Sequence, residues 1–384
     1  MTDYVARAAA LAPRIAAAAE EIERTRRLPG SLLSALHEAG MFRLLMPRSV
    51  GGAETDPPTF VRVIETVAKA DGSTAWCMCQ NNVCGIVAAW LPAESARKVF
   101  GDADAVLAWG PGPARAVIVP GGYRVTGSWS FASGGRHATW LGAHCPVYDA
   151  DGVRQCDAAG APIELTVLFP AAAAPMTDIW HVVGLRGTAS DGYAVTDLFV
   201  PEALTLIRDV PEGRRETGPL YAMTTHLLFA CGFAAVALGL ARSLVDAVTA
   251  LALDKTPRGS GNRLRDGALF QTELAVMEAR LRGGRMYLLG ALGEVWDEVR
   301  QANAFSLDRR MALRLAATHT IHEALAVADA AYHAAGATAI FDRNPFERRF
   351  RDIHTLAQQV QARRAHYETV GRHLLGLAPD LQFI

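Results

Sequence analysis

Aromatic and hydroxyl side chains alternate along one segment of the sequence, residues 127–140, in a pattern that could bind a flat ligand. Read as a β-strand, whose successive side chains point to opposite faces, this segment places Trp129, Phe131 and Ser133 on one face. A hydroxyl at the end of an aromatic strip suits a flat heteroaromatic ring that needs a hydrogen bond at its edge. An aromatic ladder in a sheet core would look the same, so the segment alone leaves both interpretations open.

The histidines and cysteines are poorly spaced for a metal ion. His319 and His322 lie three residues apart, on one face of a predicted helix, but no third ligand accompanies them, so partly buried histidines are favoured. Cys77, Cys79 and Cys84 share one apolar segment, and a Cys-x-Cys spacing on a helix points two thiols roughly 200° apart. Core packing is therefore favoured for the cysteines, and we expect no metal.

Composition excludes several classes of ligand. The 384 residues carry 38 Lys and Arg against 39 Asp and Glu, a net charge of −1, with no basic stripe for nucleic acid. The sequence has no Walker A loop, and Gly110-Pro111-Gly112 is followed by Arg115 where a dinucleotide-binding motif would have its third glycine. The default ligand is therefore a small molecule.

The sequence also argues against a membrane protein. Hydrophobic residues make up 51% of the chain, yet no uninterrupted apolar run reaches the roughly 18 residues that would cross a bilayer. The first residues lack a basic stretch followed by an apolar run, which is the pattern of a secretory signal. We expect a cytoplasmic protein whose cysteines stay reduced.

Hydrophobic periodicity divides the chain into three regions that would position these residues. Residues 1–104 predict an all-helical domain, and its segment 74–90 is apolar around most of its circumference, which places it inside the protein. Residues 105–215 contain short apolar runs separated by glycine and proline turns, typical of an antiparallel, barrel-like β domain. Residues 216–384 return to the helical period in four long stretches, which predicts a four-helix bundle.

Four segments resemble the acyl-CoA dehydrogenases, in the same order and over nearly the full length. They are Trp109 at the entry to the β region, the segment 127–140, the segment 180–191 and the Arg-Asp segment 346–352. The resemblance implies a mainly α fold with a central β domain, in which an amino-terminal helical domain and a carboxy-terminal four-helix bundle flank the strands. It also implies a homotetramer.

This fold is shared by dehydrogenases and monooxygenases, so function requires a separate argument. A dehydrogenase needs a carboxylate base, and the two positions that relatives use fall near Val360 and Phe229. By contrast, the segments 72–76 and 367–376, together with 127–134, resemble the group D monooxygenases. Those enzymes take reduced flavin, FMN or FAD, from a separate reductase and form a flavin C4a-hydroperoxide with molecular oxygen. The resemblance thus implies oxygenation of a small aromatic or heteroatom-bearing substrate.

The resemblance also implies roles for particular residues. Ser133 would hydrogen-bond flavin N5 and Trp109 would flank the flavin ring. A water-excluding wall would consist of Phe131, Trp129 and the inner face of segment 77–84.

Two further sets of polar residues have an ordinary structural interpretation beside the functional one. Asn81 or Asn82 would donate to the substrate or the peroxide, although a polar pair satisfied by helix packing is equally plausible. Arg258 or Arg263 would reach a flavin phosphate of the same or an adjacent subunit, whereas solvated arginines are more common in loops.

The sequence departs from these relatives near its end. Where many of them have a histidine after a glutamine, this chain reads Gln358-Gln359, and His354 lies five residues earlier, about 140° away on a continuous helix. Gln359 can donate a hydrogen bond but cannot titrate, and His354 is equally consistent with a surface histidine. Two alternatives therefore remain: an acyl-CoA dehydrogenase with an unrecognised base, and a non-catalytic ligand-binding protein on the same fold.

Overall fold

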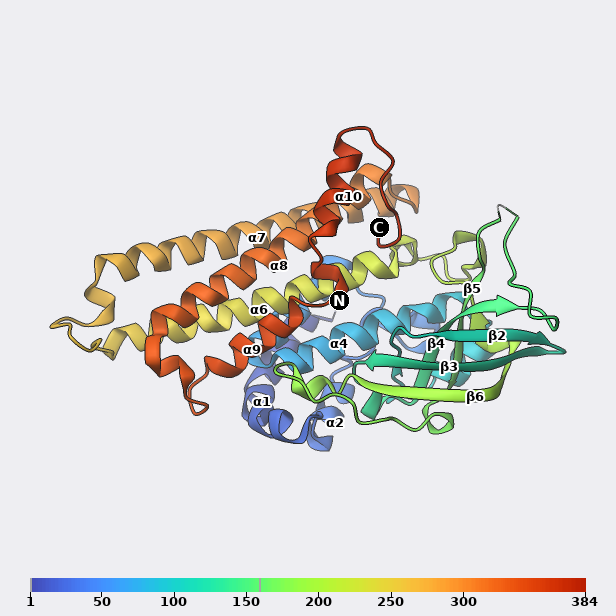
Figure 1. Ribbon diagram of the computed structural model, residues 1–384, viewed down its shortest axis with the longest axis horizontal. Coiled ribbons are helices and arrows are strands. Elements are labelled where there is room, and N and C mark those ends of the chain that lie inside the picture. Colours follow the sequence, from blue (N-terminus) through green and yellow to red (C-terminus); the bar gives the residue numbers. More distant parts are fainter. Residues whose placement is uncertain (1, 159) are drawn as a thin grey trace.

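The computed structural model describes residues 2–158 and 160–384, with a β-sheet at one end of the molecule and long helices that extend away from it (Figure 1). Five helices precede the sheet: α1 (Tyr4–Thr25), α2 (Gly30–Glu38), α3 (Pro57–Ala70), α4 (Gly72–Gly85) and α5 (Ala93–Phe100). Five follow it: α6 (Thr225–Asp254), α7 (Ala268–Ala302), α8 (Leu307–Ala335), α9 (Glu347–Leu356) and α10 (Ala365–Leu374). The mainly α fold with a central β region, predicted from the sequence, is confirmed.

Helix α4 lies at the centre of the molecule, between the long helices and the sheet (Figure 1). Asp71 begins it by accepting hydrogen bonds from the backbone N–H and the hydroxyl of Thr74, both at 2.7 Å. All its residues except Trp76 are buried, as its apolar circumference predicted. A helix buried on every side can place side chains against the sheet and against α6 at once.

The sheet has seven strands and is mixed, which corrects the expected antiparallel arrangement. The strands are β1 (Leu107–Ala108), β2 (Ala114–Val119), β3 (Gly122–Ala132), β4 (Trp140–Tyr148), β5 (Glu164–Pro170), β6 (Asp191–Pro201) and β7 (Thr205–Leu206). The order is β6-β3-β2-β4-β5-β7, and β4 runs parallel to both β1 and β2. The parallel pairs arise because the chain leaves β3 through a short helical turn and returns on the other side of β2. The domain boundaries at 104/105 and 215/216 fall between elements and remain our proposal.

Strand β3 breaks its alternation at Phe131, which corrects the expectation of one aromatic face. The pairing with β6 shifts register between Trp129 and Ala132, and Phe131 has a φ of 62°. This bulge turns Phe131 outward, so its side chain is 58% exposed, whereas Trp129 is 2% exposed and stacks on Tyr193 inside the sheet. Trp129 therefore belongs to the core, and Phe131 is the aromatic residue available to a ligand.

The carboxy-terminal bundle has three long helices instead of the expected four. Helix α6 is long and apolar enough to cross a membrane, but 94% of its most apolar window is buried in the molecule, as in a core helix. The fourth stretch divides into α9, a 3-10 turn at Val360–Ala362, and α10. The side-chain oxygen of Gln359 accepts the backbone N–H of Gln361 at 2.8 Å and so begins the 3-10 turn that follows α9.

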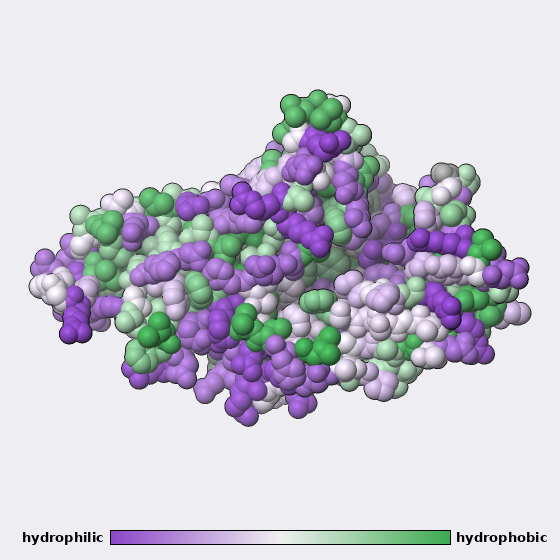
Figure 2. Space-filling view, viewed as in Figure 1, coloured by the Kyte–Doolittle hydropathy of each residue, from purple (hydrophilic) through white to green (hydrophobic). Residues whose placement is uncertain are grey.

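The molecular surface has a hollow between two projecting parts of the protein. In Figure 2 the surface is recessed between the β-sheet and the projection formed by α10 and the chain end. The tip of that projection is apolar, because Leu374, Leu375 and Leu377 are exposed there.

Candidate active site

Three hydroxyl groups form a hydrogen-bonded chain where the end of β3 meets α4. Trp76 donates its indole N–H to Ser133 Oγ at 2.9 Å, and Ser133 Oγ lies 2.6 Å from Ser190 Oγ. Ser190 Oγ lies 2.8 Å from Thr188 Oγ1, which donates to the carbonyl of Leu185 at 2.9 Å. All three hydroxyl residues are buried, so their hydrogen bonds are shielded from competing water. The sequence predicted a role for Ser133 but not its hydrogen bonds with Ser190 and Thr188, although both residues lie in the segment 180–191.

Two aromatic side chains stand at the surface beside this chain. Phe131 packs edge-on against Trp180, with 5.8 Å between ring centroids. Trp180 is held by a hydrogen bond from its indole N–H to the Leu185 carbonyl, at 3.0 Å. A large exposed aromatic side chain held on a bulge is costly to leave in water, and a flat ring stacked on it would remove that cost.

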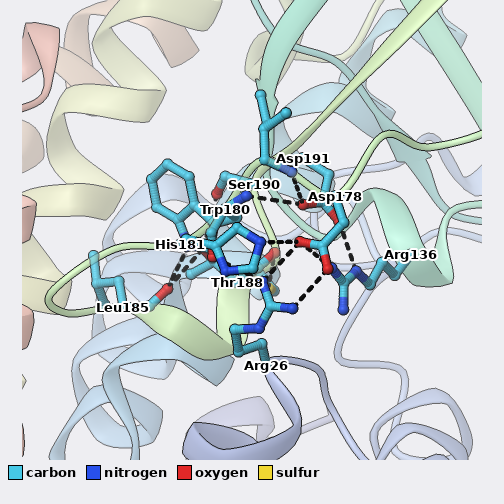
Figure 3. A network of polar contacts seen from close by, with 11 residues as sticks. Arg26, Arg136, Asp178, Trp180, His181, Leu185, Thr188, Ser190 and Asp191 are labelled. Carbon is cyan, nitrogen blue, oxygen red and sulfur yellow. Dashed lines mark hydrogen bonds and ion pairs between the residues drawn. The ribbon is translucent and has the colours of Figure 1, made fainter.

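An ionic network fixes the backbone on both sides of the hydroxyls (Figure 3). Arg136 donates to the carboxylate of Asp191 at 2.6 Å and contacts Asp178 at 3.2 Å. Asp178 also forms a two-pronged ion pair with Arg26, at 2.6 and 2.7 Å, and Arg26 comes from the end of α1. The second oxygen of Asp191 accepts the backbone N–H of Trp180 at 3.2 Å. The network therefore ties α1, the turn after β3 and the loop before β6 into one frame.

An apolar aromatic stack continues from the hydroxyl chain into the helical bundle. The ring of Trp76 stacks on Phe233 at 3.9 Å, and Phe233 stacks on Phe229 at 5.7 Å. The resemblance places the base of a dehydrogenase near Phe229 or Val360, and neither of these side chains can accept a proton. This side of the site can exclude water but offers no base at those positions.

The two adjacent asparagines have different surroundings, and both are engaged. Asn82 is fully buried, accepts the backbone N–H of Leu44 at 2.7 Å, and donates to the carbonyls of Met41 and Met78 at 2.7 and 2.8 Å. Both its donors are used, so the structural interpretation is favoured for Asn82 over a catalytic one.

Asn81 instead packs beneath the turn that follows Ser133. It donates to the carbonyl of Leu107 at 3.1 Å and contacts the ring of His137 at 3.1 Å. Burial lowers the pKa of His137 to about 3, so its ring is neutral and donates to the Asn81 oxygen. A Cβ added at Gly134 would lie 2.5 Å from that same oxygen, which explains why the turn has a glycine there.

Trp109 is buried inside the β region instead of facing solvent beside Phe131. Its ring meets the edge of His144 at 5.1 Å, and the guanidinium of Arg208 lies 5.8 Å from its centre. Its carbonyl accepts a hydrogen bond from Gln80 of α4 at 3.3 Å. Trp109 is thus a core residue, and its side chain is 4% exposed. Its contact with a flavin ring stays a proposal.

The structure separates the two residues considered near the end of the chain. His354 lies on α9 and points to α8, where its ring nitrogen meets Asp329 at 2.8 Å. The angle of 140° expected between His354 and Gln359 was wrong, because α9 ends at Leu356 and Gln359 begins a separate turn. Gln359 Nε2 is buried and has no hydrogen-bond partner among the described residues. A buried donor without an acceptor is unfavourable, so Gln359 is suited to a ligand oxygen.

The remaining sequence candidates lie elsewhere. Arg258 and Arg263 are exposed in the loop between α6 and α7, at the end of the bundle farthest from the sheet (Figure 1). That placement separates both arginines from Ser133 of the same chain, and their exposure is consistent with solvated loop arginines; a role toward an adjacent subunit stays a proposal. His322 meets the carbonyl of Ala362 at 3.0 Å, and within residues 2–158 and 160–384 no cluster of three metal-ligating side chains occurs.

The helical pattern of the sequence did not reveal a buried arginine in α8. Arg314 is completely buried and donates to the side chain of Gln361 at 2.5 Å and to the carbonyl of Phe383. Burial lowers its pKa to about 10. His226 lies beside it, and burial followed by the charges of Arg208 and Arg314 lowers the pKa of His226 to about 3. Helical periodicity cannot reveal a buried arginine, because the pattern assigns such residues to the surface.

The residues fit a bound flavin. A flat ring would stack on the exposed Phe131, and its edge would meet the hydroxyl of Ser133. The buried Gln359 Nε2 has no hydrogen-bond partner among the described residues and is a donor available to a ligand oxygen. When bound, a reduced flavin supplies the two electrons that activate oxygen.

Comparisons with known proteins identify the family of the chain. Residues 5–99 match the family model described as acyl-CoA dehydrogenase, N-terminal domain, and residues 231–364 match acyl-CoA dehydrogenase, C-terminal domain. The chain is 28% identical to an indole-3-acetate monooxygenase of Pseudomonas putida, covering 94% of this chain and 90% of that protein. It is also 28% identical to the oxygenase component of an FADH2-dependent resorcinol hydroxylase of Rhizobium sp. strain MTP-10005, covering 99% and 95%.

A solved structure extends the likeness to three dimensions. XiaF from Streptomyces sp., solved in complex with FADH2 and glycerol, superposes with a TM-score of 0.90 at 28% identity, covering 98% of this chain and 96% of that one. The chain therefore belongs to the acyl-CoA dehydrogenase superfamily and, within it, to the flavin-dependent monooxygenases.

Proposed function

We propose that this protein is the oxygenase component of a two-component monooxygenase that hydroxylates a small aromatic substrate. Reduced flavin arrives from a separate reductase, and one oxygen atom of O2 enters the substrate while the other leaves as water. The two electrons and two protons of the reduced flavin balance that water, and the flavin departs oxidised. Two relatives are named as an indole-3-acetate monooxygenase and a resorcinol hydroxylase, and these names support an aromatic substrate for this protein.

The observation that carries this proposal is the juxtaposition of Ser133 and Phe131 with a wall that lacks a base. Ser133 and Phe131 offer a hydrogen bond and a stacking surface to a flat ring. The adjoining wall of Trp76, Phe233 and Phe229 excludes water from the reacting atoms. A dehydrogenase would require a carboxylate in this wall, so the same features disfavour that alternative.

The individual roles follow from the geometry. Ser133 binds the flavin edge, Phe131 stacks on the ring, and Trp109 closes the interior behind it. Gln359 orients the substrate or the oxygen through its free Nε2, because an amide can donate but cannot exchange a proton at neutral pH. His354 is assigned to the ion pair with Asp329.

The decisive test supplies reduced flavin and labelled oxygen. The protein would be mixed anaerobically with reduced FMN or reduced FAD, and then exposed to 18O2 with a panel of phenols and indoles. We expect one substrate to gain a single 18O atom by mass spectrometry. If every substrate is recovered unchanged and all oxygen appears as hydrogen peroxide, the proposal is wrong. Bleaching of the oxidised flavin by an acyl-CoA would support the dehydrogenase instead, and failure to bind either flavin would support a non-catalytic protein.

We further propose a cytoplasmic homotetramer. Helix α7 exposes Leu269, Val276 and Met286, and a groove of about 750 Å³ lies beside it, lined by Arg263 and by residues of α8. An apolar face of this kind supports contact with a second copy, through which Arg263 would reach a neighbouring flavin. Light scattering at micromolar concentration tests this proposal, since a strict monomer would exclude a shared site.

A further inference from the structure

The chain of hydroxyls at the site runs between a group that can only donate and a group that can only accept. Trp76 Nε1 carries a hydrogen and has no lone pair to offer, and it donates to Ser133 at 2.9 Å. The Leu185 carbonyl has no hydrogen, and it accepts from Thr188 at 2.9 Å. Ser190 lies between the other two hydroxyls, at 2.6 Å from Ser133 and 2.8 Å from Thr188. Because each hydroxyl has one hydrogen, the orientation of one sets the orientation of the next.

Three orientations keep both internal hydrogen bonds, but in one of them Ser133 and Thr188 both donate to Ser190, so the hydrogen of the buried Ser190 has no acceptor in the chain. Two orientations remain. In the first, Thr188 donates to Leu185, Ser190 donates to Thr188, and Ser133 donates to Ser190. Ser133 then has no hydrogen left and presents only a lone pair. In the second, Thr188 donates to Ser190 and Ser190 donates to Ser133, which frees the Ser133 hydrogen but gives up the bond from Thr188 to Leu185.

Backbone and ionic contacts hold the segments that carry the three hydroxyls, so the hydroxyls cannot move apart when their hydrogens reorient. The N–H of Gly134, the residue after Ser133, donates to the Thr188 carbonyl at 2.9 Å. Asp191, the residue after Ser190, is tied to Arg136 at 2.6 Å (Figure 3). The first orientation therefore has one more hydrogen bond than the second within an otherwise fixed frame.

This difference matters because the flavin edge changes its hydrogen-bonding character with oxidation state. N5 of the reduced isoalloxazine carries a hydrogen, whereas N5 of the oxidised ring has only a lone pair. We propose that the chain Ser133–Ser190–Thr188 holds Ser133 as a hydrogen-bond acceptor and so selects reduced over oxidised flavin. Ser190 and Thr188 are positioning residues in this scheme, since they act through Ser133. The inference rests on the proposed function, because it requires flavin N5 at Ser133.

The advantage is that of one neutral hydrogen bond, which corresponds to roughly a three- to tenfold preference in dissociation constant. It would bias the site toward loading the form that reacts with oxygen and releasing the spent form. Other contacts of the flavin act on both forms and set the absolute affinity.

The test compares two substitutions at Thr188, a residue that does not itself reach the ligand. Thr188→Val keeps the shape of the side chain but removes its hydroxyl, so Ser190 loses the oxygen to which it donates. The Ser190 hydroxyl then donates to Ser133 instead, and the hydrogen of Ser133 is free to point at the flavin. Thr188→Ser keeps the hydroxyl and serves as the matched control. Dissociation constants for reduced and oxidised FMN and FAD would be measured anaerobically, by fluorescence or calorimetry, without substrate or oxygen.

We expect Thr188→Val to lower the ratio of the oxidised to the reduced dissociation constant by threefold or more, and Thr188→Ser to leave it unchanged. In a Ser133→Ala background the effect of Thr188→Val should vanish, because the chain then ends before the flavin. Equal ratios in the parent protein and both Thr188 variants would overturn the inference while leaving the proposed function intact. Failure of the parent protein to bind reduced flavin would instead overturn the proposed function.

Discussion

The guanidinium of Arg136 lies 2.6 Å from the carboxylate of Asp191, and this ion pair spans the two chain segments that carry the site hydroxyls. Arg136 comes three residues after Ser133, and Asp191 directly follows Ser190. The Asp191 side chain is 1% exposed, so its charge depends on Arg136 and on two backbone N–H groups. The distance between Ser133 and Ser190 is thus set by a buried charge pair outside the ligand site.

Removal of Arg136 should destabilise the fold more than removal of its neighbour Arg26. Arg136→Ala leaves a buried carboxylate without its cation, which costs about 3–5 kcal/mol in the free energy of unfolding. Arg26→Ala breaks an ion pair with Asp178, which is half exposed, and should have a much smaller effect. Urea denaturation of both variants measures the difference. Equal midpoints would show that the Asp191 pair does not hold this frame.

Ser133→Ala should leave the protein folded but reduce the yield of product per oxygen consumed. The change removes the hydrogen bond to the flavin edge, and one neutral hydrogen bond is worth about 1 kcal/mol, or roughly a fivefold change. Oxygen uptake and product would be measured together. Ser128→Ala, on the exposed part of the same strand, is the control. An unchanged yield in Ser133→Ala would mean that Ser133 is only a strand residue.

Substitutions near the end of the chain should separate Gln359 from His354. Gln359→Ala removes the buried donor and should lower product formation about tenfold, the value for one hydrogen bond placed at a reacting group. His354→Ala breaks a half-exposed ion pair and should leave activity within twofold of the parent. Gln358→Ala, at an exposed neighbouring position, is the matched control.

Restoring the family residue gives a complementary result. Gln359→His should retain or raise product formation with a phenol, because an imidazole N–H can replace the amide donor. It should also add a dependence on pH near 6.5, the ordinary pKa of histidine. If His354→Ala were the damaging change and the Gln359 variants behaved like the parent, the roles assigned to these two residues would be reversed.

The sequence predicted the elements well and the site only in part, for physical reasons. Helical periodicity identified the buried segment that became α4, because burial of nearly every side chain is visible in composition. Strict alternation failed at Phe131, since a bulge depends on the pairing of β3 with β6 and not on local residue types. The partners of Ser133 come from residues 57 positions away in both directions, Trp76 and Ser190, and no local pattern encodes such a meeting.

The break before α10 illustrates the same limit. The sequence predicted a continuous fourth helix here, yet α9 ends at Leu356, and Gln359 caps a separate 3-10 turn through its bond to the backbone of Gln361. The Gln361 side chain is in turn held by Arg314, 47 residues away in α8. The tertiary contact therefore decides the local structure, and the expected geometry between His354 and Gln359 failed with it.

Acidification should weaken the fold between pH 6.5 and 5. Burial first, and neighbouring charges second, lower the pKa values of His137, His144 and His226, so these rings stay neutral in the folded protein. In the unfolded chain they take up protons below about pH 6.5, which favours unfolding as the pH falls. His37 and His366 have lowered pKa values as well and act in the same direction.

Asp352 opposes this trend and provides the test. Burial first, and then the charges of Asp71 and Glu23, raise its pKa from 3.8 to about 7, although the backbone N–H of Leu185 and the charge of Arg348 act in the opposite direction. The folded protein therefore holds a proton on Asp352 between about pH 4 and 7 that the unfolded chain has lost, so this group favours folding as the pH falls. The three histidines with the largest shifts outnumber this one carboxyl, and His37 and His366 add to them, so the unfolded chain takes up more protons in total and the free energy of unfolding should decrease toward pH 5. Asp352→Asn keeps an oxygen for Leu185 but removes the opposing proton, so its stability should fall more steeply, with close to one more proton taken up on unfolding than in the parent. Urea midpoints at pH 7.5, 6.5 and 5.5 for the parent and this variant measure both slopes, and parallel curves would show that Asp352 is ionised in the folded protein across this range.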